Sequence, residues 1–468
     1  MSTTRLRTRL RNRFRYPLAG VMATALVSAA AAQSFDGEDD PQPAVVDLAV
    51  VGGLLIDGHE GPPLPGAVVL VEGDRIVAVG SRDVLTVPAG AEVVDARGMT
   101  ILPGLIDAHV HLDILGHSDY QHWHGRYREG RYAEIMAIST RQLLLSGVTT
   151  AVDLAGQPDA LGGIQDRIES GDLPGPRVVA SMGWITNWTD EQVARHHRRS
   201  HTVNVRTVEE ARAAARTAIA QGAGIIKVHT GLTEAQMRAI REEADAAGIR
   251  ITGHVGTRDD LLMRIRAGQD GIEHLSLGAG SGSAVAPEVL RGLVDRGTYV
   301  IPTMIQTAIQ GRAVEWPDWR DNPRARAMTP PAIWADIRRS IEHPRRFGYF
   351  GGSLRVRRIE DMGAKLRQLR DAGVRVLVGT DSGTPLNFHT DALWQEMDLM
   401  VSYGFAPLEV LAMATRRNAE YLGRGGDLGT VTRGKLADLI VVDGNPLLSM
   451  RDLRNVVTVV KDGRVYTP

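Results

Sequence analysis

The sequence predicts an α/β protein in which a (β/α)8 barrel carries a small β-sandwich domain built from both ends of the chain. Short β-rich runs with tight turns occupy residues 45–98 and 423–468. Between them, at residues 99–422, apolar strand-like runs alternate with helical patterns, which is typical of a parallel sheet. The chain of 468 residues, 43% of them hydrophobic, is long enough for a large barrel and a smaller domain.

The N-terminus has the composition of a secretory signal. Six arginines lie within residues 5–15, an apolar run follows at residues 16–32, and this run ends in alanines. The order of charged, apolar and small residues predicts a signal peptide at residues 1–32. We therefore expect an exported protein, periplasmic or secreted, that meets the membrane only during export. The apolar run is also about long enough for an uncleaved membrane anchor, which is the alternative.

Charge and cysteine content limit the partners and the compartment. Loss of residues 1–32 would remove six of the 54 Lys and Arg residues and none of the 55 Asp and Glu residues, which makes the net charge about −7. An acidic protein is a poor match for nucleic acid, so we expect a small-molecule substrate and no nucleic acid partner. A homo-oligomer is compatible with the sequence. The chain has no cysteine, and a core of this size needs no disulfide.

The two end segments read as antiparallel strands. Residues 45–98 contain the runs VVGGLLIDG, GAVVLVEGDRIVAVG and AEVVDARG, with a tight turn at Glu72-Gly73-Asp74. The last forty residues have the same character, in GKLADLIVVDGNP and VVTVVKDGRVY. Neither segment alone has enough strands for a stable sheet, so we expect both to form one β-domain.

Eight strand-like runs lie in the barrel segment, and helical patterns separate most of them. Residues 208–222 and 234–248 flank the fourth run, each with apolar residues at helical spacing. Eight such units are what a closed TIM-type barrel needs, and active sites in that fold lie at the carboxyl ends of the strands. The predicted strands are residues 100–111, 149–154, 177–182, 224–229, 250–254, 271–274, 298–304 and 374–380.

One connection is far longer than an ordinary loop of this fold. Residues 305–362 carry three tryptophans and many arginines, and long insertions in compact domains are often lids or binding loops. The alternatives are a solvated helical excursion or an oligomer contact. The arginines at 338, 339, 345 and 346 are compatible with recognition of a substrate carboxylate or with a solvated face.

Three residues on two of the predicted strands are suited to metal binding. His109 and His111 lie two apart on a strand, so both point into the barrel while Val110 faces outward. Lys227 is embedded in an apolar run, where burial favours a neutral, nucleophilic amine. Such an amine can add carbon dioxide and become a carbamate, an anionic ligand with two oxygens. A snorkelling or ion-paired lysine is the alternative.

Three further positions complete the candidate set. His254 and His274 end consecutive strands, where each can donate one nitrogen to a metal. Asp381 follows the last strand, where a carboxylate can bind metal and also accept a proton from bound water. Taken singly, these residues also fit hydrogen-bonded loop histidines and a turn aspartate. His229 shares the inward face with Lys227, and we expect it to contact substrate or to pack.

The order HxH, Lys, His, His, Asp resembles the amidohydrolase superfamily in its binuclear form with a carboxylated lysine. The runs GGLLIDG, ILPGLIDAHVH and GTVTRGKLADLIVVDGNP are similar to its β-domain and first barrel strand. Within it, IIKV, GIEHLS and GTDSG resemble the imidazolonepropionase-like and Xaa-Pro dipeptidase-like branch. This resemblance implies two divalent metal ions, with zinc the first choice and manganese, cobalt or iron close behind. It also implies that a hydroxide between the metals attacks the substrate.

The resemblance assigns a role to each candidate residue. It implies that the more buried metal is bound by His109, His111 and Asp381, and the more exposed metal by His254 and His274. A carboxylated Lys227 would bridge the two metals. Asp381 would take the proton from the hydroxide and pass it to the leaving group.

Two departures from the branch lie at the pocket. HTGL follows the strand at residues 229–232 where dipeptidase-like members have Ala-Thr-Gly-Gly, and GHVG replaces HAHG around His254. Imidazolonepropionases use one metal and lack the bridging lysine. We therefore predict a hydrolase that cuts an amide-type C–N bond of a small-molecule or dipeptide-like substrate. Alternatives are a heterocycle deaminase, a hydrolase of cyclic amides or lactones, and, in another class, an inactive binding module.

A second H-x-H, His122 and His124, lies in a polar stretch and is interpreted as pocket rim.

Overall fold

A computed structural model describes residues 45–468, apart from 128–129, 197–200, 278–281, 316–319 and 343–351. The chain separates into two units, Met1–Gly37 and Glu38–Pro468, and all of the described residues belong to the second. The predicted signal peptide lies outside the described residues. Among the residues described, none of the helices combines the length and apolarity needed to cross a bilayer.

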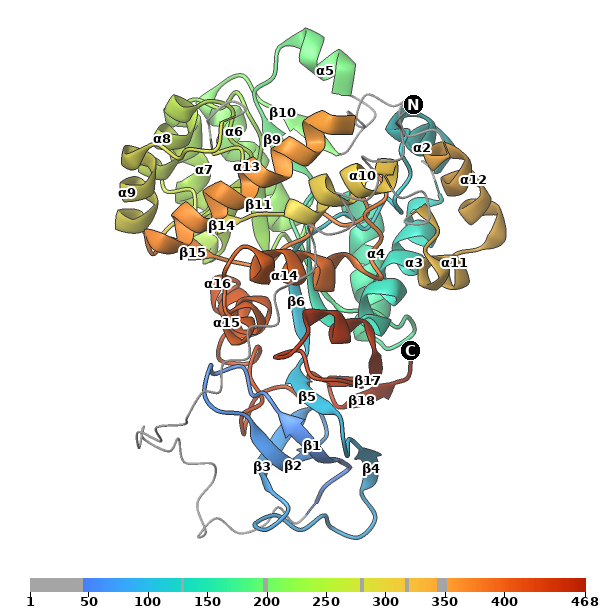
Figure 1. Ribbon diagram of the computed structural model, residues 1–468. Helices are drawn as coiled ribbons and strands as arrows, with labels where there is room; N and C mark the ends of the chain where they lie inside the picture. Colours follow the sequence, from blue (N-terminus) through green and yellow to red (C-terminus); the bar gives the residue numbers. More distant parts are fainter. Residues whose placement is uncertain (1–44, 128–129, 197–200, 278–281, 316–319, 343–351) are drawn as a thin grey trace, which may run out of the picture. The chain divides into compact units, whose positions relative to one another are not determined.

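Strands from both ends of the chain form one eight-stranded sheet (Figure 1). The two segments meet where β5 pairs antiparallel with β16, Leu102 opposite Ile440. The sheet runs β18-β17-β16-β5-β1-β2-β3, and β4 pairs with β1. Its strands are β1 (Leu48–Leu55), β2 (Leu64–Glu72), β3 (Arg75–Ser81), β4 (Glu92–Asp95), β5 (Thr100–Pro103), β16 (Leu439–Val442), β17 (Val456–Lys461) and β18 (Arg464–Tyr466).

Alternating side chains give this sheet two apolar faces. On one face, Val50 and Val69 share a buried cluster with Leu439 and Val441 from the other end of the chain. On the opposite face, Ala49, Val68 and Leu70 belong to a second cluster. A period of two residues is what a pleated strand imposes, so each strand contributes to both faces. The apolar side chains of both chain ends are thus needed for one domain core.

Eight parallel strands form the barrel. They make two hydrogen-bonded runs, β6-β7-β8 and β11-β12-β13-β14-β15. The runs join through Gly224 N–H to Ala180 O (3.0 Å) and through Ala108 N–H to Val378 O (3.1 Å), which closes the barrel. The strands are β6 (Leu105–Val110), β7 (Val148–Asp153), β8 (Arg177–Ala180), β11 (Ile225–Val228), β12 (Arg250–Gly253), β13 (Gly271–Glu273), β14 (Tyr299–Ile301) and β15 (Arg375–Val376).

Further hydrogen bonds join the first barrel strand, β6, to the last strand, β15, and to the segment that follows it. The Asn418 amide donates to Ile106 O (2.7 Å) on one strand and to Val378 O (2.8 Å) beyond the other. His111 N–H donates to Ser382 O (2.9 Å), and Asp381 N–H donates to His109 O (2.8 Å). These bonds fix the segment after β15 beside the end of β6.

Several strand predictions were wrong in their bounds. Residues 100–111 form two strands, because β5 joins the end sheet and β6 joins the barrel. Gly104 separates them, and a Cβ there would lie 2.1 Å from the Thr149 hydroxyl. Regular pairing of the seventh and eighth barrel strands covers only Tyr299–Ile301 and Arg375–Val376. The helix α10 already begins at Met304.

A pair of short strands was not predicted. The strands β9 (Trp184–Thr186) and β10 (Thr202–Asn204) run parallel, and β9 also pairs with β11, Trp184 opposite Lys227. The pair extends the barrel wall at the carboxyl end of β11. It brings a tryptophan to the rim above the barrel.

Helices surround the barrel strands (Figure 1). The two predicted around the fourth strand, α6 and α7, are confirmed, and each begins with a capping box, at Thr207 and Thr233. The α-helices are α2 (Tyr120–Tyr127), α3 (Tyr132–Leu145), α4 (Pro158–Glu169), α5 (Asp190–His196), α6 (Val208–Ala220), α7 (Glu234–Ala247), α8 (Arg258–Arg266), α9 (Pro287–Arg296), α10 (Met304–Glu315), α11 (Pro323–Met328), α12 (Pro331–Ile341), α13 (Gly352–Asp371), α14 (Ala392–Ser402), α15 (Pro407–Ala412) and α16 (Asn418–Tyr421). A π-helical turn (Met413–Arg417) and a 3₁₀ turn (Met450–Arg454) complete the set.

The described part of the long insertion is helical. It comprises α10, α11, α12 and the start of α13, and α12 packs on the α2 region through Ser118 N–H to Ser340 Oγ (3.1 Å). Arg338 pairs with Asp321 (3.2 Å) on the surface of the insertion. The arginines at 345 and 346 lie outside the described residues. A lid role for the insertion stays a prediction.

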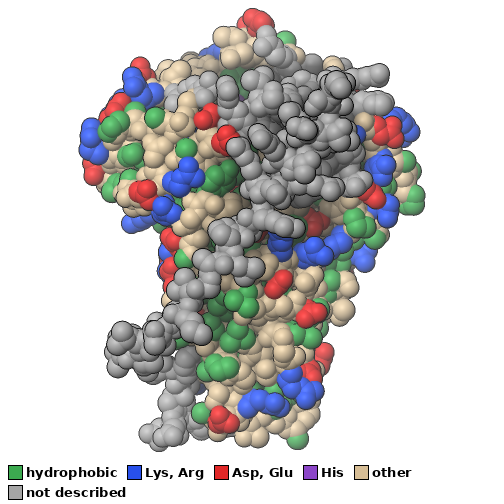
Figure 2. Space-filling model, in the orientation of Figure 1, with side chains coloured by type: hydrophobic (Ala, Val, Ile, Leu, Met, Phe, Trp, Pro, Cys, Tyr) green, Lys and Arg blue, Asp and Glu red, His purple; other side chains and the backbone are tan. Residues whose placement is uncertain are grey.

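Charged side chains of both signs are interspersed on the face seen in Figure 2. Among the described residues, Arg326 and Arg338 share Asp321, and Arg212 pairs with both Glu242 and Glu243. Each of these arginines thus has a carboxylate partner.

Candidate metal centre and its cavity

Three of the predicted ligands meet where β6 ends beside the segment after β15. Asp381 Oδ1 lies 2.9 Å from His111 Nε2 and 3.4 Å from His109 Nε2. The two Nε2 atoms are themselves 3.4 Å apart. Two ligand atoms of one tetrahedral zinc ion lie roughly 3.3 Å apart when each bond is about 2.0–2.1 Å. The spacing of these three side chains therefore suits a common ion.

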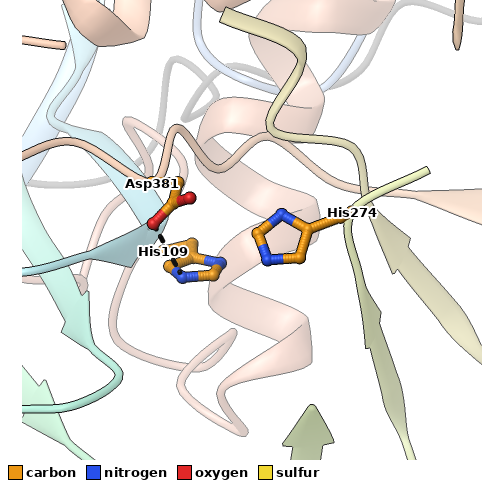
Figure 3. A group of neighbouring side chains, drawn as sticks. All are labelled: His109, His274 and Asp381. Carbon is orange, nitrogen blue, oxygen red and sulfur yellow. Dashed lines mark ion pairs between the residues drawn. The ribbon is translucent and has the colours of Figure 1, made fainter. Parts of the chain in front are cut away.

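The next pair lies at the ends of β12 and β13. His254 Nε2 and His274 Nε2 approach to 2.8 Å, and the His274 ring is centred 5.3 Å from the His109 ring. One ligand atom each from His109, His274 and Asp381 lie within 4.8 Å of one another. Figure 3 shows His274 and Asp381 directed toward His109 from separate elements. The structure thus brings five of the six predicted residues together at these strand ends.

Lys227 is the sixth. Its side chain, on β11, is 1% exposed, and Nζ forms no hydrogen bond. Burial lowers the pKa of Lys227, although Glu273 and Asp381 partly oppose this shift. The charge of Lys227 in turn contributes to lowering the pKa of both His109 and His254. Lys227 is therefore an unpartnered buried amine next to both groups of histidines.

Two residues that the sequence analysis missed orient the imidazoles. Glu273 Oε2 accepts a hydrogen bond from His109 Nδ1 (2.7 Å), and Thr303 Oγ1 is bonded to His274 Nδ1 (2.6 Å). With Nδ1 engaged, the Nε2 lone pair of each ring faces the cluster. The second partner of Glu273 is Thr252, whose hydroxyl donates to Oε1. The Glu273 carboxylate is therefore itself held by a second hydrogen bond while it orients the His109 ring.

The backbone is in the left-handed region at three residues of the centre. His274, Thr303 and Asp381 have φ of 67°, 47° and 58°. Such conformations cost of order 1–3 kcal/mol each for residues other than glycine and cluster at functional sites. They turn the chain sharply where each strand ends, which aims these side chains inward.

Electrostatics keep most of the cluster in the ionisation states that bind metal. His111 is the exception: burial lowers its pKa, but the hydrogen bond to Asp381 and the charge of that carboxylate outweigh burial and raise it. Burial lowers the pKa of His254 and His274, and of His109 well below the usual range, so these rings are neutral. Burial alone would raise the pKa of Asp381, but His109 and the bond from His111 bring it to about 2. A neutral imidazole and an ionised carboxylate are the ligand forms of these side chains.

A cavity of about 300 Å³ opens on the cluster. His229 lines it, with its ring centred 4.1 Å from His254 and 5.1 Å from Trp184. The other lining residues are His111, Asp113, Ile114, Tyr120, Ala155, Trp184, Trp188, His254, His274, Gln306, Asp381 and Thr384. His229 thus lies at the predicted place, and its contact with substrate stays a prediction.

Asp113 is the one lining carboxylate besides Asp381 among the described residues. Burial and the nearby Asp153 raise the pKa of Asp113 to about 7. Asp153 itself accepts hydrogen bonds from Leu112 N–H (2.8 Å) and Gly156 N–H (2.6 Å). The two carboxylates therefore differ, since one supports the loops and the other faces the cavity.

A second histidine group lies away from this cavity. His122 Nε2 is 3.0 Å from Asp336 Oδ2, and the His117 ring stacks on His122 at 5.3 Å. These three residues offer ligand atoms within 4.8 Å of one another. However, His117 Nδ1 accepts from Asp119 N–H (3.0 Å), which leaves the proton on Nε2, and Arg126 lies 3.5 Å from Asp336. The group is better described as a polar contact between α2 and α12 than as a metal site.

The family of the chain follows from comparison with known proteins. The model of the amidohydrolase family matches residues 100–466. The chain belongs to the amidohydrolase family. The predicted family and the predicted fold class, a barrel with a β-sandwich domain, are thereby confirmed. Membership also supports a hydrolase as the class of enzyme.

Individual relatives are distant. The imidazolonepropionase of Symbiobacterium thermophilum is 25% identical over 447 residues, 85% of this chain and 91% of that protein. An N-acyl-D-aspartate deacylase of Alcaligenes xylosoxydans xylosoxydans is 44% identical over 82 residues, which is 17% of this chain and 16% of that one. The crystal structure of a Xaa-Pro dipeptidase with bound methionine has a TM-score of 0.71 at 24% identity, and covers 90% of this chain and 100% of that chain. At this identity the structural likeness shows the fold alone.

Proposed function

We propose that this amidohydrolase is an exported, metal-dependent hydrolase that cuts an amide-type C–N bond of a small-molecule or dipeptide-like substrate. The observation that carries the proposal is the convergence of six donor side chains at the carboxyl ends of the barrel strands. Imidazole Nε2 atoms 2.8–3.4 Å apart and an ionised carboxylate within 3.4 Å of two of them form a ligand set for divalent ions.

The donor set divides naturally between two ions. His109, His111 and Asp381 would hold the more buried ion, and His254 with His274 the more exposed one. Zinc fits imidazole and oxygen ligands best, with manganese, cobalt or iron close behind. Together with a modified Lys227, all six residues would then act as ligands.

The buried amine of Lys227, which has no hydrogen-bond partner among the described residues, supports the proposal that this lysine is carboxylated. Its nitrogen can add to carbon dioxide, forming an N–C bond and releasing one proton, which yields an anionic carbamate. The carbamate has two oxygens, which suits a bridge between the two ions. Unmodified, Lys227 Nζ is a buried polar atom without a partner, and such an atom is costly.

The catalytic roles fall to few side chains. When bound, two divalent ions would lower the pKa of a water molecule and polarise the substrate carbonyl. Asp381, ionised at neutral pH, would accept the proton of the attacking water and deliver it to the leaving nitrogen. Glu273 and Thr303 hold the rings of His109 and His274 in the orientation that leaves Nε2 free. His229 and the tryptophans beside it would bound the substrate.

The relatives support a C–N bond as the target. One of the similar proteins is named as a deacylase of N-acyl-D-aspartate and another as a Xaa-Pro dipeptidase. The experiment is to load the protein, produced from residue 33, with zinc and to screen N-acyl amino acids and Xaa-Pro dipeptides. Metal-dependent turnover supports the proposal, whereas turnover of lactones or phosphotriesters alone contradicts it. Ammonia release from heterocycles would identify a deaminase, and failure to bind metal would identify an inactive binding module.

Export is tested separately. Expression of the full chain in a bacterial host with a cleavage-competent export system should give a periplasmic or secreted product whose N-terminus is Gln33 by mass spectrometry. A membrane-bound product that keeps its N-terminus would identify an anchor instead.

A further inference from the structure

The cavity has an aromatic wall beyond His254. The Trp184 ring is centred 6.0 Å from the His254 ring and 6.5 Å from Trp188, and the His229 ring is 4.8 Å from Trp188. All four rings line the same cavity. They form a continuous surface of aromatic rings next to the histidines of the candidate metal centre.

The indole N–H groups of this wall are already used. Trp188 Nε1 donates to Thr230 Oγ1 (3.0 Å), and Trp184 Nε1 donates to Leu154 O. The two indoles can therefore offer a ligand only their ring faces and edges. Such a surface takes flat apolar groups by stacking and cations by interaction with the ring face.

Beyond His111, the lining contains the carboxylate of Asp113. Asp113 is 4% exposed, and its carboxylate is bonded to the backbone N–H of the same residue. Its neighbour Asp153, by contrast, accepts hydrogen bonds from the backbone N–H groups of Leu112, Ala155 and Gly156. A carboxylate has two oxygens with several acceptor positions, so Asp113 can also accept a hydrogen bond from a ligand in the cavity.

Among the described residues that line the cavity there is no Lys and no Arg. A protonated amine bound there would meet both the Asp113 carboxylate and aromatic rings.

We propose that the substrate of this site carries a protonated amine that pairs with Asp113 and a flat apolar group that stacks on Trp184 and Trp188. This inference rests on the proposed function in that it takes the cavity as the substrate site. It names a substrate class, small molecules that carry an amine and an aromatic or similarly flat group. A volume of about 300 Å³ suits a molecule of that size.

Binding of small probes tests the inference without any need for turnover. Isothermal titration of the zinc-loaded protein at about pH 8 compares 2-phenylethylammonium with 2-phenylethanol, because the amine is still protonated there. The two probes have the same length and ring and differ in charge. We expect the ammonium probe to bind roughly tenfold tighter or more, as a charge-assisted hydrogen bond is stronger than a neutral one.

Variants assign the preference to its residues. Asp113→Asn should bring the ratio of the two affinities close to one, whereas Glu134→Gln, at an exposed carboxylate paired with Arg131, should leave the ratio as it is. Trp188→Leu should reduce the advantage of 2-phenylethylammonium over propylammonium. Trp394→Leu, at a tryptophan that lines a different cavity, should not.

The outcomes separate this inference from the proposed function. Equal affinity of the two phenyl probes for the unmodified protein, or a preference that Asp113→Asn leaves intact, overturns the inference even if amides are hydrolysed. The expected preference together with no hydrolysis of any amide supports the inference and overturns the proposed function. The measurement on the unmodified protein decides the point even where a variant fails to fold.

Discussion

Replacement of Glu273 by glutamine should weaken metal binding without removing a ligand. Glu273 accepts from His109 Nδ1 (2.7 Å) and from the Thr252 hydroxyl, and both residues are buried. A hydrogen bond to a charged group contributes about 1.5–3 kcal/mol and a neutral one about 0.5–1.5 kcal/mol, so loss of the charge alone costs roughly tenfold in affinity. The geometry adds a second effect. If the glutamine oxygen stays with Thr252, its NH₂ group faces Nδ1 and forces the proton of His109 onto Nε2, the atom that would bind the proposed ion.

The expected loss in metal affinity from Glu273→Gln is therefore about 10–100-fold, the range typical of groups that orient a metal-binding histidine. Competition with a chelator of known affinity measures the zinc dissociation constant directly. Glu288→Gln, at an exposed carboxylate 3.4 Å from Arg258, is the matched control and should bind zinc like the unmodified protein. Unchanged zinc affinity in Glu273→Gln would refute the idea that this carboxylate fixes the tautomer of His109.

Three further predictions concern single residues. Lys227→Met should lower the metal content of the purified protein, measured by elemental analysis, while the metal-free variant melts no lower than the parent, because Lys227 Nζ is buried without a partner. A lower melting temperature of the metal-free variant would show that the buried Lys227 amine does not destabilise the folded protein. Glu396 has its pKa raised by burial from 4.5 to about 8, so its contribution to stability is present below pH 4.5 and is lost as the pH rises toward 8. Glu396→Gln should therefore flatten the fall in unfolding free energy between pH 5 and 8, and an unchanged slope in urea titrations would contradict this. Thr233→Ala should cost about 0.5–2 kcal/mol of stability through loss of the α7 cap, which a shift in the urea midpoint would measure and an unshifted midpoint would contradict.

The barrel and the positions of the six candidate ligands were predictable from the sequence because a single signal repeats. Each ligand follows a short apolar run, and the carboxyl ends of parallel strands meet at one mouth. The six donors could therefore be placed without knowledge of the connections between them. The bounds of the strands were harder to predict. Residues 100–111 look like one apolar run in the sequence, but Gly104 divides them into two strands that belong to different sheets.

Glu273 escaped prediction for a physical reason. It precedes His274, and the alternation of a strand places neighbours on opposite faces, so a ligand at His274 argues that Glu273 faces outward. The left-handed backbone of His274, with φ of 67°, breaks that alternation at the strand end. Both side chains then reach the centre. No residue type in GIEHLS signals this conformation.

The aromatic wall escaped for a different reason. The strands β9 and β10 are three residues long, too short for a pattern, and β9 exists because Trp184 pairs with Lys227 far along the chain. Pairing of this kind depends on tertiary structure and leaves no local trace. The sequence therefore predicted the histidines and Asp381 of the site more readily than Trp184, Trp188 and Asp113, on which we propose that its selectivity depends.

The centre is a place where the fold is locally unfavourable. It holds a buried amine and a buried imidazole nitrogen without partners, at Lys227 and His254, and left-handed residues at His274 and Asp381. None of these features stabilises the chain, and each has a use only when a ligand engages it. The contacts around them are stabilising. Asn418 bonds β6 to the segment beyond β15, and Glu273 and Thr303 orient the rings of His109 and His274. Hydrogen-bonded neighbours thus hold unfavourable groups in one fixed geometry. Such an arrangement is expected where the fold binds a ligand. Because the unfavourable groups lie among the candidate metal ligands, metal binding should be tested before substrate binding.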